Sequence, residues 1–320
     1  MLKIKPIVCI VFPCYNEEEV IPHTAREISK LLEDIIGSGK ISEKSYACFV
    51  DDGSKDKTWN FIETSAIGNK LVKGVKLSGN FGHQNALLAG LFSEEENADC
   101  FITIDVDLQD DIIAIEEMVD KYLEGNKIVY GVRENRDNDS ILKKHTAQLF
   151  YKLMERLQVK TIYNHADFRL IDSSIIKELR NFKEVNIFLR SIFPLMGFEY
   201  TSVHYKRRKR MQGESKYPLK KMISFAWEGI TSFSVKPLRM LFYTGLIFFL
   251  LSMVLGVWVL ISLIAGETIQ GWASILLIIL LFSGINMISL GIIGEYVGKI
   301  YIETKERPRY IIEKKNKINE

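Results

Sequence analysis

The chain has 320 residues, of which 47% are hydrophobic and 26% are charged; these proportions exclude a disordered chain and allow one or two globular units. Its 42 basic and 40 acidic residues give a formal net charge of +2, which argues against a nucleic-acid-binding protein, because such proteins usually carry a dominant basic excess. The hydrophobic residues are unevenly distributed, since residues 241–264 and 273–293 contain no Lys, Arg, Asp or Glu.

The first 133 residues alternate between short apolar segments and longer segments with helical periodicity. We expect strands at Ile7–Phe12, Tyr46–Val50, Leu71–Leu77, Phe101–Ile104 and Lys127–Val132. We expect helices at Glu17–Ile36, Lys57–Ile67, His83–Glu95 and Ile112–Glu124. This alternation predicts a mostly parallel α/β sheet, in which ligands bind beyond the carboxyl ends of the strands.

Cysteine use and the N-terminal residues indicate a cytosolic domain. The cysteines Cys9, Cys14, Cys48 and Cys100 lie in or beside the apolar segments, without a close metal-ligand pairing, so we expect reduced thiols in a core. Residues 1–13 lack the long apolar region and small-residue cleavage site of a signal peptide, and they read as a first strand.

Polar clusters follow the first two expected strands. Pro13–Glu19 ends the first strand and opens an acid-rich helix, which is also what a plain strand-to-helix turn with favourable helix-dipole placement would contain. Asp51–Thr58 ends the second strand, and its aspartates could accept hydrogen bonds from a nucleotide base or ribose. The alternative is a helix N-cap at Ser54 or Asp56.

The strongest local signal is a pair of carboxylates, Asp105 and Asp107, at the end of the fourth expected strand. Residues two apart on an extended chain point to the same face, so these carboxylates repel each other unless a cation lies between them. Hard oxygen ligands from few protein groups suit Mg²⁺ or Mn²⁺ that also binds a substrate diphosphate. A solvated acidic turn is the alternative.

Six motifs in order resemble those of the family-2 inverting glycosyltransferases, which have a Rossmann-like GT-A fold. They are Pro13-Cys14-Tyr15-Asn16-Glu17, Asp51-Asp52-Gly53-Ser54, Asn80-Phe81-Gly82-His83-Gln84, Asp105-Val106-Asp107-Leu108-Gln109, Asp167-Phe168-Arg169-Leu170 and Gly213-Glu214-Ser215-Lys216-Tyr217. The resemblance is closest to the polyprenyl-phosphate glycosyltransferases, the group of bactoprenol glucosyltransferases and dolichol-phosphate mannose synthases. It covers nearly the whole chain.

The resemblance implies roles for particular residues. The nucleotide-sugar site would comprise Pro13, Tyr15, Asn16, Glu17, Asp51, Asp52, Asp105, Val106 and Arg133. The metal, Mg²⁺ or Mn²⁺, would bind Asp105, Asp107 and Gln109, and the catalytic residues would be Asp167 and Arg169. A base role for Asp167 is a hypothesis, because a phosphate acceptor is already ionised at neutral pH and the carboxylate could orient it instead.

A basic run, Lys206–Arg210, lies shortly before Lys216. Basic groups beside a membrane commonly only attract anionic lipid, and this explanation suffices for most of the run. The family motif implies direct contact with the acceptor phosphate for Arg208, Arg210, Ser215 and Lys216.

The C-terminal third has the pattern of a membrane anchor. Residues 218–237 mix lysines with large apolar residues, as an interfacial amphipathic helix does, although a helix packed on the globular domain would also fit. The charge-free runs 241–264 and 273–293 are long enough to span a bilayer as two helices, and a buried hairpin in a soluble protein is the alternative. Basic residues flank the runs, which by the positive-inside rule places both flanks in the cytoplasm.

We therefore expect a cytosolic GT-A domain at 1–215, interfacial helices at 216–239, a transmembrane hairpin at 240–295 and a cytosolic tail at 296–320, whose charged end 313–320 should be frayed. The resemblance implies transfer of a hexose, glucose from UDP-glucose, to undecaprenyl phosphate at the bacterial inner membrane. It also implies a homo-oligomer, such as a tetramer. The alternatives are another sugar (mannose, N-acetylglucosamine or a modified arabinose) and a non-catalytic protein that binds lipid or a flippase.

Overall fold

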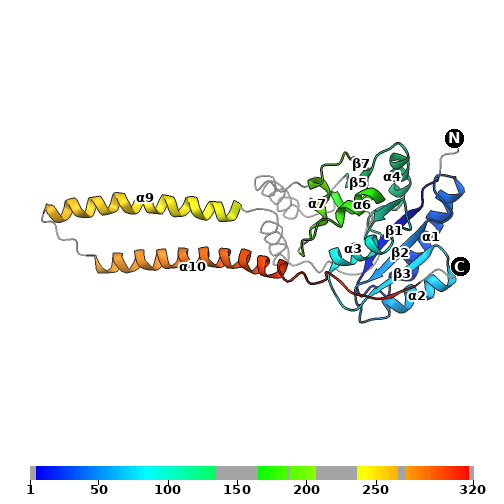
Figure 1. The fold of residues 1–320 in the computed structure, drawn as a ribbon, viewed down its shortest axis with the longest axis horizontal. Coiled ribbons are helices and arrows are strands. Elements are labelled where there is room, and N and C mark those ends of the chain that lie inside the picture. The colour runs from blue at the N-terminus through cyan, green and yellow to red at the C-terminus, as the bar shows by residue number, and fades with distance from the viewer. Residues whose placement is uncertain (1–4, 135–164, 186, 207–235, 266–270, 317–320) are drawn as a thin grey trace. The chain divides into compact units, whose positions relative to one another are not determined.

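The computed structural model describes residues 5–134, 165–185, 187–206, 236–265 and 271–316. They belong to two compact units. The first unit comprises residues 1–152, 160–216 and 308–320, and the second comprises residues 153–159 and 217–307. The first is an α/β domain, and the described part of the second consists of two long helices (Figure 1).

The first unit contains the strands and helices in an order that begins as the sequence predicts. They are β1 (Val8–Cys14), α1 (Ile21–Gly37), β2 (Tyr46–Asp51), α2 (Thr58–Gly68), β3 (Val72–Leu77), α3 (His83–Ser93), β4 (Cys100–Thr103), α4 (Ala114–Leu123), β5 (Ile128–Arg133), β6 (His165–Asp172), α6 (Ser173–Leu179), α7 (Leu189–Leu195), β7 (Thr201–Tyr205) and β8 (Ile312–Lys315). The prediction that the first helix opens with acidic residues is wrong, because Glu17 to Glu19 precede α1, which begins at Ile21. Pro22 lies in its first turn, where a missing backbone N–H costs nothing.

The eight strands form one mixed sheet in the order β7-β5-β6-β4-β1-β2-β3-β8. The pairs β1–β2, β1–β4, β2–β3 and β5–β7 are parallel, as expected. β6 is antiparallel to both β4 and β5, and β8 is antiparallel to β3. The antiparallel β6 is decisive for the site, because its beginning lies beside the end of β4.

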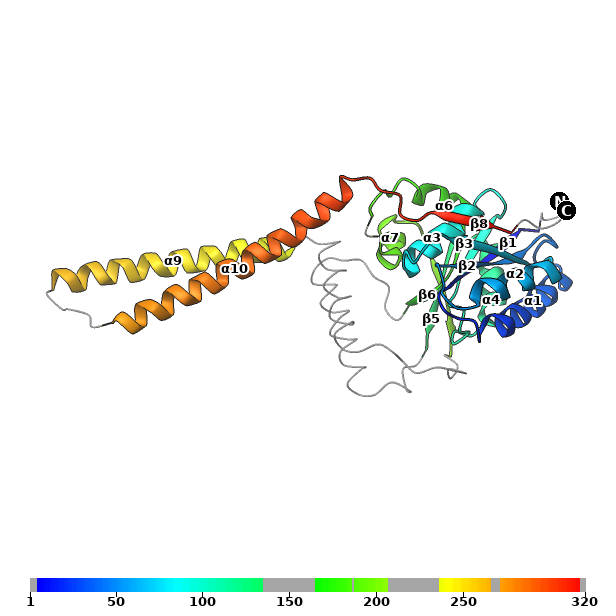
Figure 2. The same ribbon diagram turned by 90° about the horizontal axis from the view of Figure 1, so that it is seen from below.

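Helices cover both faces of the sheet (Figure 2). On one face, α1 buries Ile21, Ala25, Ile28, Leu32 and Ile35, a helical spacing that packs one stripe against the strands. The same core includes side chains from α2 and α4. On the other face α3 approaches so closely that a Cβ at residue 90 would lie 2.5 Å from a methyl of Val11, which explains Gly90.

All four cysteines are free and buried, as the sequence predicts. Part of the tail that was expected to be frayed, residues 313–315, is in a strand, and residues 317–320 lie outside the described residues. Residues Ile312–Lys315 form β8 at the edge of the sheet, where Lys76 forms an ion pair with Glu313 at 3.0 Å and Lys314 forms one with Glu63 (Figure 2). The exposed charged side chains of β8 suit an edge strand, because charges there discourage pairing with another chain.

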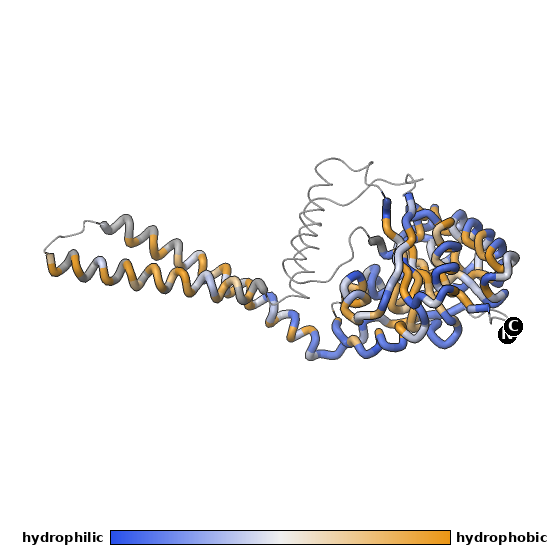
Figure 3. The backbone as a smooth tube through the Cα atoms, turned by 90° about the horizontal axis from the view of Figure 1, so that it is seen from above, coloured by the Kyte–Doolittle hydropathy of each residue, from blue (hydrophilic) through white to orange (hydrophobic). Residues whose placement is uncertain are grey.

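The second unit contains α9 (Lys236–Ile264) and α10 (Trp272–Glu303). Where Figure 3 colours these helices, they are largely hydrophobic, and many of their large apolar side chains are exposed, among them Phe242, Trp258 and Ile288. Within the described residues, no helix meets the combined length and apolarity needed for a bilayer crossing. Most of the expected interfacial segment 216–239 lies outside the described residues.

Candidate active site

The site lies where β1, β2 and β4 end and where β6 begins. Because β1 pairs in parallel with β2 and β4, the carboxyl ends of these strands lie at one edge of the sheet. Thr103 is paired with Arg169 across the antiparallel β4–β6 ladder, so continuing this register by two residues brings Asp105 opposite Asp167. The Thr103 hydroxyl donates to the Asp167 carbonyl oxygen at 2.6 Å and fixes the two strand ends together.

A cavity of about 250 Å³ opens at this edge. Its lining combines three acidic strand ends with the loop that leads into α3. The lining residues are Pro13, Cys14, Tyr15, Glu17, Asp52, Asn80, Gly82, His83, Ala86, Asp105, Val106 and Asp107. Six of the residues expected at the nucleotide-sugar site line it: Pro13, Tyr15, Glu17, Asp52, Asp105 and Val106.

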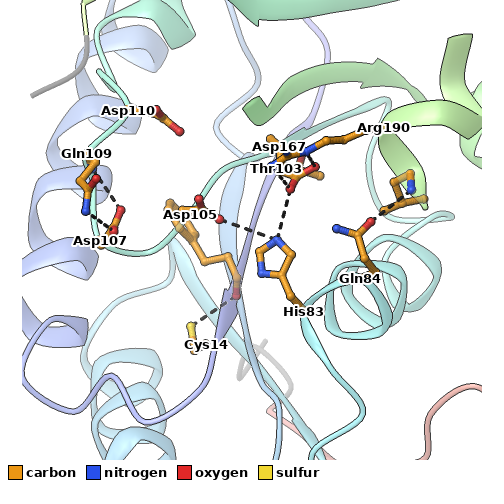
Figure 4. A network of polar contacts seen from close by, with 12 residues as sticks. Cys14, His83, Gln84, Thr103, Asp105, Asp107, Gln109, Asp110, Asp167 and Arg190 are labelled. Carbon is orange, nitrogen blue, oxygen red and sulfur yellow. Dashed lines mark hydrogen bonds and ion pairs between the residues drawn. The ribbon is translucent and has the colours of Figure 1, made fainter. Parts of the chain in front are cut away.

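His83 lies between the two facing carboxylates. Its Nε2 is 3.7 Å from an oxygen of Asp105 and 3.7 Å from an oxygen of Asp167 (Figure 4). Burial lowers the pKa of His83, but Asp167 and Asp105 outweigh this effect and the pKa lies above its ordinary value. The imidazole therefore links the end of β4 to the beginning of β6.

Asp105 is accessible from the cavity but recessed within it, with 44% of its side chain exposed. Loss of hydration in this recess is the main cause that raises the pKa of Asp105; the positive charge of His83 opposes it, and the carboxylates of Asp167, Asp110 and Asp107 raise the pKa further. The surroundings of Asp105 thus disfavour its negative charge, a setting that favours a bound cation.

Asp167 has the opposite surroundings. Its side chain is 7% exposed and forms ion pairs with two arginines, Arg169, which is completely buried, and Arg190. Arg190 donates from Nη2 to Oδ2 at 2.8 Å and from Nε to Oδ1 at 3.2 Å. Burial alone would raise the pKa of Asp167, but Arg190, His83 and Arg169 outweigh it and hold the pKa well below its usual range.

The loop after β4 orients Asp107 rather than leaving it solvated. The side-chain amide of Gln109 donates to Asp107 at 2.7 Å, and the backbone N–H of Gln109 donates to the same carboxylate at 3.2 Å. Between them Leu108 has a φ of +47°, a left-handed conformation that a branched side chain rarely adopts. Such strain often accompanies a functional loop. Gln109 supports Asp107 and is itself absent from the cavity lining.

The two aspartates at the end of β2 are both buried, but they differ in their partners. Asp52 accepts hydrogen bonds from the backbone N–H groups of Phe81 and Gly82, at 2.7 and 2.9 Å, and so shapes the loop before α3. Asp51 accepts from the Ser54 N–H with one oxygen, while its Oδ2 is buried without a hydrogen-bond partner among the described residues. Burial raises the pKa of both carboxyls.

Asn16 joins the loops that follow β1 and β2. Its backbone N–H donates to the Ser54 hydroxyl at 2.9 Å, and its side-chain oxygen accepts from the Lys55 N–H at 2.9 Å. A glycine is required at residue 53, because its φ is +65° and a Cβ there would lie 2.3 Å from the backbone of Gly79. Asn16 therefore holds the cavity wall and does not line the cavity.

Arg133 also lies outside the cavity lining. Its guanidinium pairs with Asp110 at 2.9 Å and donates to the Tyr205 hydroxyl at 3.3 Å. Burial lowers the pKa of Arg133, and Asp110 and Tyr205 more than compensate for it. The expected acceptor residues Arg208, Arg210, Ser215 and Lys216 lie outside the described residues.

A family model for glycosyl transferase family 2 matches residues 9–180, which include every strand end that forms the cavity. The chain belongs to glycosyl transferase family 2.

Relatives match the family-2 chain over almost its full length. An uncharacterized glycosyltransferase of Bacillus subtilis, YkoT, is 48% identical over 98% of this chain and 93% of the relative. The bactoprenol glucosyl transferase of Shigella phage SfII is 38% identical over 98% of this chain and 99% of the relative. A prophage bactoprenol glucosyl transferase homolog of Escherichia coli is 38% identical over 97% of this chain and 99% of the relative. The protein is therefore a glycosyltransferase.

Solved structures support the fold of this glycosyltransferase. Mannosyl-3-phosphoglycerate synthase from Rubrobacter xylanophilus superposes with a TM-score of 0.50 over 73% of this chain and 74% of that chain, at 16% identity. At this identity the likeness supports the α/β architecture of the family and carries no information on substrates.

Sequence reasoning missed Arg190 in this glycosyltransferase. The residue lies in the first turn of α7, outside all six motifs, and its contact with Asp167 joins two parts of the chain that are 23 residues apart. In the sequence, Arg190 is recognisable only as one basic residue before the basic run Lys206–Arg210, which does not indicate a contact with Asp167. The Asp105, Asp107 and Asp167 carboxylates were identified, but their opposite electrostatic surroundings were not.

Proposed function

We propose that this glycosyltransferase moves glucose from UDP-glucose to undecaprenyl phosphate and forms a β-linked polyprenyl-phosphate sugar for the modification of surface glycans. The observation that carries the proposal is the match, over almost the whole of both chains, to proteins named bactoprenol glucosyl transferase. The geometry agrees, because acidic strand ends suited to a metal-bound nucleotide-sugar line the cavity, and one lining residue, His83, faces Asp167 with its arginines, which suit a second anion.

The donor would bind along the ends of β1, β2 and β4. Tyr15, 42% exposed at the cavity, offers a ring for stacking on a base. The Oδ2 of Asp51 accepts no hydrogen bond from the described residues. The N–H of a uracil ring would be a suitable donor to it. The Oδ2 atom is buried, so its use requires the adjoining loop to open toward the base.

The residues present fit a divalent cation, Mg²⁺ or Mn²⁺, held by Asp105 and Asp107. Both carboxylates line the same cavity, and the raised pKa of Asp105 reflects a negative charge that burial disfavours and a cation would stabilise. In the described part of the chain, no group of three or more His, Cys, Asp or Glu side chains is arranged to hold a metal. The diphosphate of the donor would therefore complete the coordination. A cation bound there stabilises the negative charge of the departing diphosphate.

The reaction is a single displacement with inversion. An oxygen of the acceptor phosphate attacks the anomeric carbon of glucose as the bond from that carbon to the UDP oxygen breaks, and the electron pair leaves with UDP. The acceptor phosphate is ionised at neutral pH, so the step needs no proton acceptor. The residues at the cavity must instead hold two anions in line, which is a task of positioning and charge.

The proposal includes attachment to the cytoplasmic membrane through the C-terminal region, with the catalytic unit and both termini in the cytoplasm. It is supported by the charge-free runs 241–264 and 273–293, by the length of α9 and α10, and by their exposed apolar side chains. Arg208, Arg210, Ser215 and Lys216, immediately before and at the start of the interfacial segment 216–239, would bind the lipid phosphate. We also propose a homo-oligomer, such as a tetramer, formed through the membrane region.

The test uses membranes that contain the full-length chain, undecaprenyl phosphate and Mn²⁺ or Mg²⁺. Radiolabelled UDP-glucose should give label that is extracted into organic solvent and released as glucose by mild acid. Parallel reactions with GDP-mannose and UDP-N-acetylglucosamine identify the sugar, and membranes without the chain provide the background. Absence of extractable label with every donor, with or without metal, would contradict the proposal.

A further inference from the structure

The pair of arginines at Asp167 contains one buried and one accessible cation. Arg169 is completely buried, and it lies with its guanidinium 5.1 Å from the centre of the Phe193 ring. Arg190 is 35% exposed. Arg169 can therefore balance the charge of Asp167 but is out of reach of a ligand, whereas Arg190 can hold Asp167 and also contact a molecule that enters from solvent.

The carboxylate of Asp167 has little capacity left to accept a proton. Its Oδ1 accepts from Arg169 Nη2 and from Arg190 Nε, and its Oδ2 accepts from Arg190 Nη2 and faces His83. These contacts take up most of the lone pairs of a carboxylate. Two arginines beside this carboxylate also stabilise its charged form, which is the reverse of the surroundings that a general base requires.

The position of Arg190 is fixed from the donor side of the site. The side-chain oxygen of Gln84, one residue after His83, accepts a hydrogen bond at 3.2 Å from the backbone N–H of Leu189, the first residue of α7 (Figure 4). The loop and helix that carry His83 thus hold the start of α7. Because His83 also faces both Asp105 and Asp167, the cationic cluster and the acidic strand end belong to one site.

We propose that Arg190 binds the phosphate of the acceptor, and that Asp167 is a positioning residue that orients Arg190 and not a base. This inference rests on the proposed function, since it assigns the subsite for the second substrate of that reaction. Nε and Nη2 of Arg190 donate to Asp167, which holds the partly exposed guanidinium in one orientation. A guanidinium held in this way suits an attacking phosphate that must be aimed as well as neutralised. Two phosphate-bearing substrates repel each other, so a cation on the acceptor side complements the acidic, metal-favouring donor side.

The test compares Arg190→Gln and Arg190→Lys in the purified full-length chain, with UDP-glucose and a short-chain polyprenyl phosphate. The matched control is Arg180→Gln, because Arg180 pairs with Glu95 at the surface and its side chain is 50% exposed. Arg190→Gln should raise the KM for the polyprenyl phosphate by about tenfold or more and change the KM for UDP-glucose by less than about twofold. The KM of Arg190→Lys for the polyprenyl phosphate should lie between those of the wild type and Arg190→Gln, because lysine keeps the positive charge and loses the planar guanidinium.

Inorganic phosphate and a double-variant comparison separate binding from a structural effect. Inorganic phosphate should compete with the lipid acceptor in the wild type and lose most of this competition in Arg190→Gln. If Asp167 acts through Arg190, Asp167→Asn should also raise the acceptor KM, and combining it with Arg190→Gln should add little. A base role predicts instead that Asp167→Asn lowers kcat at unchanged acceptor KM and alters the acid side of the pH profile.

Thermal unfolding of each variant guards against loss of fold. Equal increases in the KM values of both substrates, or an acceptor KM in Arg190→Gln within about twofold of the wild type, would overturn the inference. If Arg190→Gln unfolds at the assay temperature, Arg190→Lys decides by the same criterion. Failure of the proposed function looks different, because the wild type would then form no lipid-linked sugar at all.

Discussion

The end of β4 and the beginning of β6 face each other across the site, and each presents an aspartate in an opposite electrostatic setting. Burial and neighbouring carboxylates raise the pKa of Asp105, whereas the arginines and His83 hold the pKa of Asp167 well below its usual range. The same residue type therefore does different work on the two strands. Asp105 forms no ion pair with Lys or Arg among the described residues, whereas Asp167 forms ion pairs with Arg169 and Arg190.

The largest expected effect comes from removing the acidic side. Asp105→Asn should lower kcat/KM for transfer by roughly a hundredfold to a thousandfold, since it removes the carboxylate best placed to hold a cation at the donor diphosphate. The lipid-extraction assay measures this loss. Asp34→Asn on the exposed face of α1 is the control. Near-normal turnover by Asp105→Asn would show that the Asp105 carboxylate is not needed for transfer, and that its difference from Asp167 does not affect catalysis.

Chelation should act on the same side of the site. Treatment with EDTA should abolish most of the transfer, and added Mn²⁺ or Mg²⁺ should restore it. In Asp107→Asn the metal concentration for half-maximal activity should rise by about tenfold, because one of the carboxylates that we propose as ligands loses its charge. Full activity in EDTA, in protein that elemental analysis shows to be free of metal, would contradict the proposed cation site at Asp105 and Asp107.

A smaller effect is expected at Asp51, at the next strand end. Asp51→Asn keeps an oxygen for the Ser54 N–H but changes the buried Oδ2 position that we assign to the base. The KM for UDP-glucose should rise by about tenfold, and the KM for the acceptor should remain within about twofold. Isothermal titration with UDP alone checks the same contact. Unchanged UDP affinity would place base recognition elsewhere.

The midpoint of thermal unfolding should shift in opposite directions in Asp105→Asn and Asp167→Asn. Asp105 has a raised pKa in the folded state, so its charge opposes folding at neutral pH; without metal, Asp105→Asn should raise the midpoint of thermal unfolding by about 2 °C. Asp167 has a lowered pKa, so it stabilises the fold above its unfolded pKa and this contribution is lost only as pH falls through the folded value. Asp167→Asn should therefore lower the midpoint at neutral pH, by several degrees.

Calorimetry on the full-length chain in detergent measures both shifts. The deficit of Asp167→Asn should persist to a pH below the ordinary range of a carboxyl and then shrink. Shifts of the same sign in both variants would show that loss of packing, and not the local charge, dominates at these positions.

The sequence predicted where the acidic strand ends meet better than it predicted the cations that face Asp167, for a physical reason. Asp51, Asp105 and Asp107 follow parallel strands, whose carboxyl ends must meet at one edge, so local pattern and topology suffice. Arg190 lies on α7 and contacts Asp167, and the antiparallel pairing of β6 with β4 brings Asp167 opposite Asp105. Both are contacts between distant parts of the chain that no local pattern encodes. The tail prediction was wrong at residues 313–315 for a related reason, because no local pattern shows that this segment pairs with β3 or that Glu313 forms an ion pair with Lys76.

β8 makes the catalytic unit discontinuous in sequence, because its last strand follows the two long helices. A single proteolytic nick between residues 207 and 235 would leave two fragments that are still linked noncovalently, through the β3–β8 backbone ladder and the contact of Arg309 with the Phe182 carbonyl. Truncation before residue 308 would do more than shorten a tail. It would uncover the backbone donors and acceptors of β3 and offer a template for strand pairing between molecules.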